Sequence, residues 1–269
     1  MEALLISLQP IVDAALREVC DSQADAAGLQ VRGFGSRIYG AAGANSDFDF
    51  CLELPPAIAC QAKVIRAAVR QKLVNSGFAK FNDTYDAPDK STLSWKTVSG
   101  QRASINVSLE GDVSSALAST DCLRRLFDKH SFVTEPAVSI AEMLRAANHM
   151  AVEGSVQDTL KSAAFFFLCF GLLKGRLRIS KEELLLDIAH FDANSSIVFV
   201  DLSAATASLE PRHVGNYTNA SLDYRHERDT LVVIQSNGKD FNNSAAKVTD
   251  PRWCSIQKVC SAAAGESSS

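Results

Sequence analysis

The sequence predicts an α+β protein, in which a small unit with a mixed sheet and flanking helices precedes a mainly helical half. Three observations predict this class. The chain has 269 residues, which is enough for two compact domains. Residues 47–54 alternate polar and apolar side chains, which is the period of a strand buried on one face. From about residue 119 onward, apolar residues recur at the three- to four-residue spacing of helices.

Each helix or strand is predicted from the periodicity of its apolar residues and from the Gly, Pro or Ser residues that bound it. In the first half, the pattern predicts a helix over 2–20, strands over 30–34 and 47–54, a helix over 59–75, and strands over 93–98 and 103–109. Ser99-Gly100 is a hairpin signal between the last two strands. In the second half, it predicts helices over 119–129, 139–152, 158–174 and 181–191, and short strands over 197–202 and 230–234. We expect domains at 1–118 and 119–261 and a disordered tail at 262–269.

Composition narrows the class of protein. Apolar residues make up 46% and charged residues 22%, which excludes a collagen, a coiled-coil rod or a disordered chain. No apolar run is long enough for a membrane span, and the first residues show no targeting pattern. The seven cysteines form no CxxC pair, which favours a reducing, intracellular compartment without structural zinc; cytoplasm, nucleus and mitochondrion stay open. The net charge of −4 does not exclude a local basic strip that binds nucleic acid.

The chemistry is expected in a Gly-Ser turn followed by a pair of aspartates. Gly35-Ser36 precedes Asp47-Phe48-Asp49 by ten residues. Carboxylates at i and i+2 of a strand point the same way, about 7 Å apart. Mg2+ commonly takes one or two carboxylates together with substrate phosphates. Gly35 permits close backbone approach, and Ser36 and its neighbouring N–H groups can bind phosphate oxygens. The alternative is a Gly-rich turn before an edge strand with solvated aspartates.

This motif resembles the signature of the DNA polymerase beta-like nucleotidyltransferases. With Ser46 before the aspartates, it is similar to the non-canonical poly(A) polymerases and terminal uridylyltransferases. The resemblance implies a palm domain followed by a mainly helical, PAP-associated-like domain. It implies that Asp47 and Asp49 are catalytic and bind two Mg2+ or Mn2+ ions, and that Gly35 and Ser36 contact the β and γ phosphates of a nucleoside triphosphate. The implied acceptor is a single-stranded RNA 3′ end.

The family also has a third catalytic carboxylate on a later strand, and its position corresponds to Asn106. The resemblance implies that this group helps to deprotonate the attacking 3′-hydroxyl. Asparagine cannot accept that proton, and loss of a general base typically costs about 10²–10⁴-fold in rate. Three interpretations stay open: a weak or inactive member, an engineered Asp-to-Asn replacement, or a strand register different from the expected one.

The second half resembles the family's central domain at a few positions. Arg145 and His149 stand where the family has two lysines, four residues apart on one helix face, that contact the triphosphate. Lys161 and Ser162 match the start of a helix that contacts phosphate or ribose. The family's base-stacking tyrosine corresponds to Ala163, which removes a platform worth about 1–3 kcal/mol per base. For Arg145 and His149 the alternative is an amphipathic helix with a chance arginine.

Three functions compete on this evidence. The first is a template-independent RNA 3′-terminal nucleotidyltransferase that adds UMP or AMP from NTP and releases pyrophosphate, weakly if Asn106 replaces the base. The second is an inactive, RNA- or nucleotide-binding scaffold with a protein partner in an RNA-processing complex. The third is a nucleotidyltransferase that modifies a small molecule or a protein hydroxyl. No membrane is expected as a partner.

Overall fold

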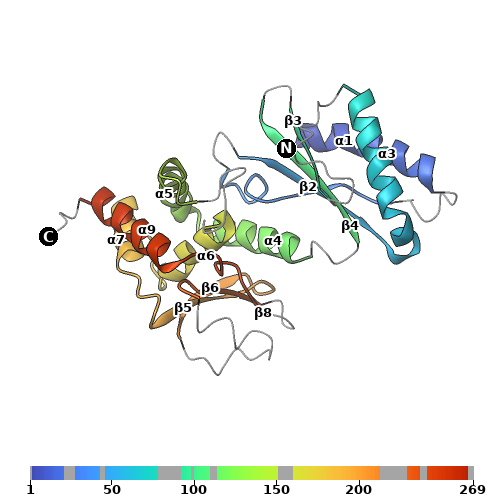
Figure 1. Ribbon diagram of the computed structural model, residues 1–269. Helices are drawn as coiled ribbons and strands as arrows, with labels where there is room; N and C mark the ends of the chain where they lie inside the picture. Colours follow the sequence, from blue (N-terminus) through green and yellow to red (C-terminus); the bar gives the residue numbers. More distant parts are fainter. Residues whose placement is uncertain are drawn as a thin grey trace. The chain divides into compact units, whose positions relative to one another are not determined.

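The chain forms two compact units, each described here by itself (Figure 1). The first comprises Met1–Ile38 and Ala44–Leu117, and the second comprises Tyr39–Gly43 and Ala118–Ser269. The computed structural model describes residues 2–20, 28–42, 46–77, 92–97, 100–109, 114–150, 160–212, 229–236 and 241–265.

In its described residues, the first unit is a four-stranded sheet with the long helices α1 and α3. In chain order its elements are α1 (Glu2–Val19), β1 (Arg32–Phe34), β2 (Phe48–Leu54), the 3₁₀-helix η1 (Pro56–Gln61), α3 (Ala62–Asn75), β3 (Thr92–Lys96) and β4 (Arg102–Leu109). The sheet order is β1-β2-β4-β3. β2 and β4 run parallel, whereas β1 pairs with β2 and β3 pairs with β4 in antiparallel fashion.

Helices α1 and α3 pack on one face of this sheet (Figure 1). Phe50, Leu52 and Leu54 of β2 are buried in the core that these helices complete. Because side chains alternate along a strand, the intervening residues of β2 point to the opposite face. The amphipathic pattern of β2 therefore places Asp49 on the face away from α1 and α3, and Asp47 lies immediately before this strand.

In its described residues, the second unit combines helices with a second sheet. Its elements are α4 (Ser114–Lys129, which begins at the end of the first unit), η2 (Ser131–Val133), α5 (Thr134–Ala146), α6 (Ser162–Leu172), α7 (Lys181–Ala189), β5 (Ser196–Asp201), β6 (Thr206–Pro211), β7 (Val233–Ser236), β8 (Phe241–Asn243) and α9 (Asp250–Ala263). The sheet order is β6-β5-β7-β8. Helix α6 is buried from Ala164 to Leu172 and packs against β5, β6 and β7, so it forms the centre of this unit.

The predicted α+β class is confirmed, but the second unit is less purely helical than expected. Two strands of its sheet, β6 and β8, and the helix α9 have no counterpart in the sequence-based prediction. β6 is half-buried along most of its length, so it lacks a clear alternation. Helix α9 continues to Ala263, into the segment expected to be a disordered tail, because alanine favours the helix more than any other residue.

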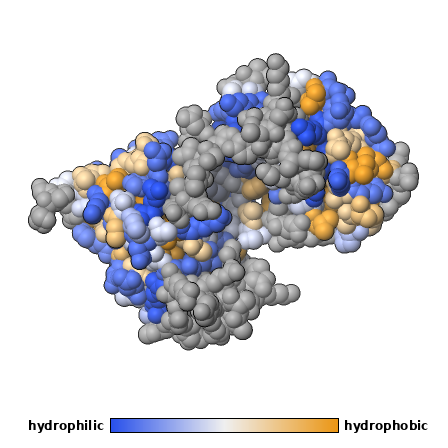
Figure 2. Space-filling view, in the orientation of Figure 1, coloured by the Kyte–Doolittle hydropathy of each residue, from blue (hydrophilic) through white to orange (hydrophobic). Residues whose placement is uncertain are grey.

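The surface shown in Figure 2 mixes hydrophilic and hydrophobic residues on both units. Among the side chains described, the large apolar ones that are exposed are Ile6, Val64, Val74, Leu109 and Leu177. Among the described helices, none has both the length and the apolar character needed to span a bilayer.

Candidate functional site

The turn after β1 is held against the second aspartate of the motif. Antiparallel pairing of β1 with β2 sets Phe34 opposite Asp49, so the chain leaves the sheet beside this carboxylate. Gly35 has φ +80°, in the left-handed region that side chains disfavour. A Cβ atom built on Gly35 would lie 3.0 Å from Asp49 Oδ2. Glycine is therefore required here twice, by its backbone conformation and by the close approach of Asp49.

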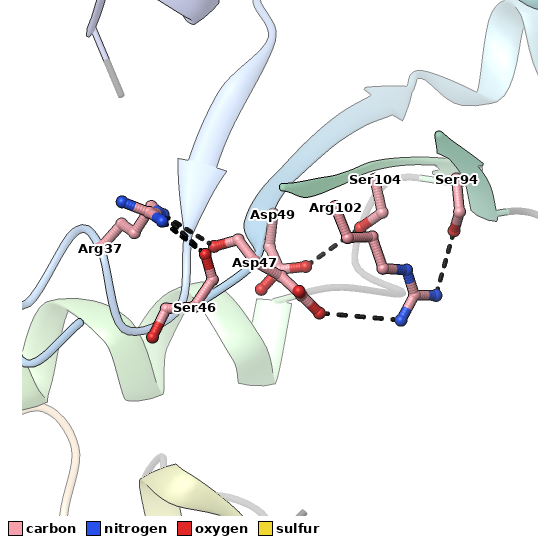
Figure 3. A network of polar contacts seen from close by, with 7 residues as sticks. All are labelled: Arg37, Ser46, Asp47, Asp49, Ser94, Arg102 and Ser104. Atoms are coloured by element: carbon pink, nitrogen blue, oxygen red, sulfur yellow. Dashed lines mark hydrogen bonds and ion pairs between the residues drawn. The ribbon is translucent and has the colours of Figure 1, made fainter. Parts of the chain in front are cut away.

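The turn continues through Ser36 and is closed by a backbone hydrogen bond from the Ile38 N–H to the Gly35 carbonyl at 3.0 Å. The Arg37 side chain then contacts the other end of the loop. Its Nε donates to the carbonyls of Ser46 and Asp47 at 3.0 and 3.2 Å, and its guanidinium carbon lies 3.9 Å above the ring centre of Phe48. Arg37 thus joins the two ends of the Gly-Ser loop and brings positive charge near the aspartates (Figure 3).

Strand β4 provides the polar neighbours of both carboxylates (Figure 3). The parallel register pairs Asp49 with Ser104, and the Ser104 hydroxyl donates to Asp49 Oδ1 at 3.0 Å. Two residues before Ser104 on β4, Arg102 forms an ion pair with Asp47, with 3.7 Å between Arg102 Nη1 and Asp47 Oδ2. Burial raises the pKa of Asp49 above its usual value, and the Ser104 hydrogen bond and the charges of Arg102 and Arg37 oppose that shift.

Asn106 does not stand beside Asp49. It pairs with Cys51 of β2 and with Thr92 of β3, two residues further along the sheet than Ser104. Its Oδ1 is buried and accepts no hydrogen bond from the described residues. The parallel register therefore places Ser104, and not Asn106, opposite Asp49. The residue beside the aspartate pair is a serine, which sequence reasoning passed over.

The donor set of the pair fits a magnesium ion. Asp49 in β2 and Asp47, immediately before this strand, carry hard oxygen ligands, and Mg2+ is often held by one or two carboxylates plus phosphates and water. Within the described part of the chain, no group of three or more His, Cys, Asp or Glu side chains could hold a metal ion.

In the second unit, the end of α5 meets the start of α6. The Leu160 N–H donates to the His149 carbonyl at 3.2 Å, and Met150 and Leu160 form an isolated parallel bridge. This pairing brings Arg145 to Ser162, with 3.2 Å between its Nη2 and the serine Oγ. Burial lowers the pKa of the Arg145 guanidinium, which nonetheless stays charged near neutral pH. Lys161 is exposed and immediately precedes α6.

His149 has a cation as its neighbour. Arg252 of α9 lies with Nη1 3.1 Å from His149 Nδ1, and it also donates to the Asn148 carbonyl at 3.1 Å. Burial and the charge of Arg252 lower the pKa of His149, so the imidazole is neutral at pH 7. Arg252, rather than His149, therefore brings positive charge to this place. The sequence offers no signal for it, because the two residues are 103 positions apart.

Comparison with known proteins defines the fold. No family model and no curated protein matches the chain. Among solved structures, Cid1 in complex with the UTP analogue UMPNPP has a TM-score of 0.63 and 15% identity over 100% of this chain and 87% of that chain. Terminal uridylyl transferase 4 from Trypanosoma brucei with bound UTP has a TM-score of 0.64 and 13% identity, covering 97% of this chain and 90% of that chain.

The polymerase core of TRAMP, an RNA surveillance complex, is similar as well, with a TM-score of 0.61, 12% identity, and coverage of 98% of this chain and 78% of that chain. Identities this low establish the architecture. The chain therefore shares the fold of these three proteins, and the α+β class that the sequence predicts is the class of that fold.

Proposed function

We propose that the chain is an RNA 3′-terminal nucleotidyltransferase, which transfers UMP or AMP from a nucleoside triphosphate to RNA in the presence of Mg2+ or Mn2+. One observation carries the proposal: in this fold, the Gly35 turn lies against Asp49, so phosphate donors and metal-binding carboxylates share one place. A solvated edge strand would not need a glycine at the point where a carboxylate oxygen approaches the backbone.

The residues of the first unit suggest how the substrate is held. The Ser36 hydroxyl and the backbone N–H groups of the Gly-Ser turn are donors for the β and γ phosphates. Asp47 and Asp49 would hold the metal ion, which when bound neutralises phosphate charge and polarises the phosphoryl group. In the proposed reaction, the RNA 3′-oxygen forms a bond to the α-phosphorus, the bond to the β-phosphate oxygen breaks, and pyrophosphate leaves. The hydroxyl proton passes to solvent or to a carboxylate.

The second unit contributes anion contacts in this proposal. Arg145 and Ser162 are joined by a hydrogen bond and present donors at the start of α6, where helix N–H groups also favour phosphate. Lys161 adds an exposed charge next to them. His149 is a neutral member of this set, because burial and Arg252 hold its pKa below the usual value.

A second candidate function is favoured by Ser104. A serine beside Asp49 cannot act as the general base that a carboxylate would provide, and the expected cost is about 10²–10⁴-fold in rate. A chain that binds nucleotide and RNA without turning them over would then act as a scaffold, with a protein partner in an RNA-processing complex.

The test is nucleotide addition to a labelled single-stranded RNA by the purified chain, with Mg2+ or Mn2+ and each of the four NTPs in turn. Asp49→Ala is the inactive reference, and Asp128→Ala, at an exposed position of α4, is the matched control. Extended RNA products that form with the control variant but not with Asp49→Ala would support the transferase. The NTP that gives these products would identify the nucleotide that is added.

Ser104→Asp and Asn106→Asp extend the same assay. If nucleotide addition appears or rises only in Ser104→Asp, the unmodified site is complete except for the general base that accepts the 3′-hydroxyl proton. If neither the unmodified chain nor any variant adds nucleotides, and the unmodified chain still binds RNA or NTP, the transferase is rejected and the scaffold is favoured.

A further inference from the structure

Strand β4 presents a cation and a hydroxyl to the two carboxylates. Arg102 lies opposite Asp47, and Ser104 lies opposite Asp49, all on the same face of the sheet (Figure 3). Arg102 cannot be a metal ligand, since a guanidinium carries only donors, and the Ser104 hydroxyl carries no negative charge. The face that holds the aspartate pair therefore already contains a positive charge of the protein's own.

Arg102 has a neutral partner as well as a charged one. Its Nη2 donates to the Ser94 hydroxyl of β3 at 3.2 Å, whereas its Nη1 lies 3.7 Å from Asp47 Oδ2. The second distance is that of an ion pair and is too long for a hydrogen bond. Because the planar guanidinium is anchored at its Ser94 end, it stays beside Asp47 as a fixed charge (Figure 3).

We propose that Arg102 is the resident counter-cation of Asp47, so that a divalent ion must compete with it and the site takes one metal ion, bound weakly in the absence of nucleotide. A metal ion at the aspartate pair would be repelled by this guanidinium. The side chains of Arg102 and Asp47 are 26% and 31% exposed, so water and salt moderate the repulsion without removing it.

Ser104 reinforces the same behaviour. Its hydroxyl donates to Asp49 Oδ1 and occupies part of the capacity of that oxygen to bind a cation. A carboxylate in place of Ser104 would add both charge and ligands beside the pair. The inference depends on the proposed function only in taking Asp47 and Asp49 as the metal-binding pair.

The experiment is a Mn2+ titration of the full chain without nucleotide, followed by the EPR signal of free Mn2+ at low ionic strength. Arg102→Gln is expected to bind Mn2+ about tenfold more tightly than the unmodified chain, since it removes a like charge close to the site. Arg102→Lys keeps the charge and should stay close to the unmodified chain. Arg178→Gln removes one exposed positive charge from the second unit and controls for net charge.

Two further variants keep the test decisive if Arg102→Gln fails to fold by circular dichroism. Ser94→Ala leaves the charge unchanged but releases the guanidinium, so the metal ion can displace it more easily; about threefold tighter binding is expected from the loss of one hydrogen bond. Ser104→Asp is expected to raise the number of bound Mn2+ ions from one to two.

Unchanged or weaker Mn2+ binding in both Arg102→Gln and Ser94→Ala would overturn the inference, and so would two tightly bound ions in the unmodified chain. A tightening that Arg178→Gln reproduces would also overturn it, because the effect would then come from net charge. None of these outcomes depends on turnover. If the chain adds nucleotides but Arg102→Gln leaves its Mn2+ affinity unchanged, this inference is refuted and the proposed function stands.

Discussion

Two glycines with nearly the same backbone conformation offer a matched test of the candidate site. Gly35 has φ +80° and Gly40 has φ +79°. A Cβ atom on Gly35 would meet Asp49 Oδ2 at 3.0 Å, whereas one on Gly40 would meet nothing within 4 Å. Gly35→Ala and Gly40→Ala therefore share the backbone cost, and only the first one disturbs the carboxylate.

The expected magnitudes separate the two effects. A left-handed residue with a Cβ costs about 1–2 kcal/mol, and the reduced freedom of the unfolded chain returns about 0.4–1 kcal/mol of this. Both variants should therefore lose about 1 kcal/mol of unfolding free energy. Gly35→Ala must in addition move the carboxylate of Asp49 by a few tenths of an ångström. Disturbing the surroundings of a metal ligand typically costs about 10–100-fold in metal affinity.

Urea unfolding and Mn2+ titration of the two variants check these numbers. We expect similar unfolding free energies for both, with Mn2+ binding weakened only in Gly35→Ala. Equal Mn2+ affinities in two folded variants would refute the reasoning, because they would mean that the contact between Gly35 and Asp49 has no part in metal binding.

Two further predictions concern stability. Burial raises the pKa of Asp49, so its contribution to stability is complete below about pH 4 and is lost as the pH rises through the raised value in the folded chain. Asp49→Asn should thus raise the unfolding free energy at pH 7 by about 0.5–2 kcal/mol, with no gain near pH 3 in urea titrations; an equal gain at both pH values would contradict the assignment. In α6, a Cβ on Gly171 would lie 2.9 Å from Val198 Cγ1. Overpacking at this contact costs about 1–3 kcal/mol, whereas alanine gains about 0.5–1 kcal/mol in helix propensity over glycine. Gly171→Ala should therefore lower the unfolding free energy by about 1 kcal/mol. The same change in a Val198→Ala background should become stabilising in urea unfolding, and a cost that persists there would exclude overpacking as the cause.

The motif of the first unit could be predicted because its information is local. The alternation of residues 47–54 gives the strand and the face of its aspartates, and Gly35-Ser36 gives the turn before it. Antiparallel pairing of β1 with β2 then brings the turn to Asp49. The strand and the turn depend on neighbours along a short stretch of chain, so spacing predicts them, whereas the pairing of β1 with β2 is known only from the structure.

The register of β4 could not be predicted in the same way. Polar residues occupy positions 102, 104, 106 and 108, all on one face of the strand. Sliding the strand by two residues leaves its apolar face in the core, so the hydrophobic pattern does not distinguish Ser104 from Asn106 as the neighbour of Asp49. The pairing of β2 with β4 fixes this choice, and the intervening chain carries no sequence signal for it.

The site therefore combines features that favour binding with a neighbour that does not favour catalysis. The Gly35 turn leaves room for the Asp49 carboxylate, because a Cβ at this position would lie 3.0 Å from Asp49 Oδ2. The residues opposite them on β4 are held by weaker constraints: a hydroxyl at Ser104 and an ion pair at Arg102 both fit the sheet. The capacity to hold a metal ion and phosphates can thus persist while the proton acceptor is absent. For this reason, binding of Mn2+ and addition of nucleotides must be measured separately in this protein, and Ser104→Asp is expected to increase both.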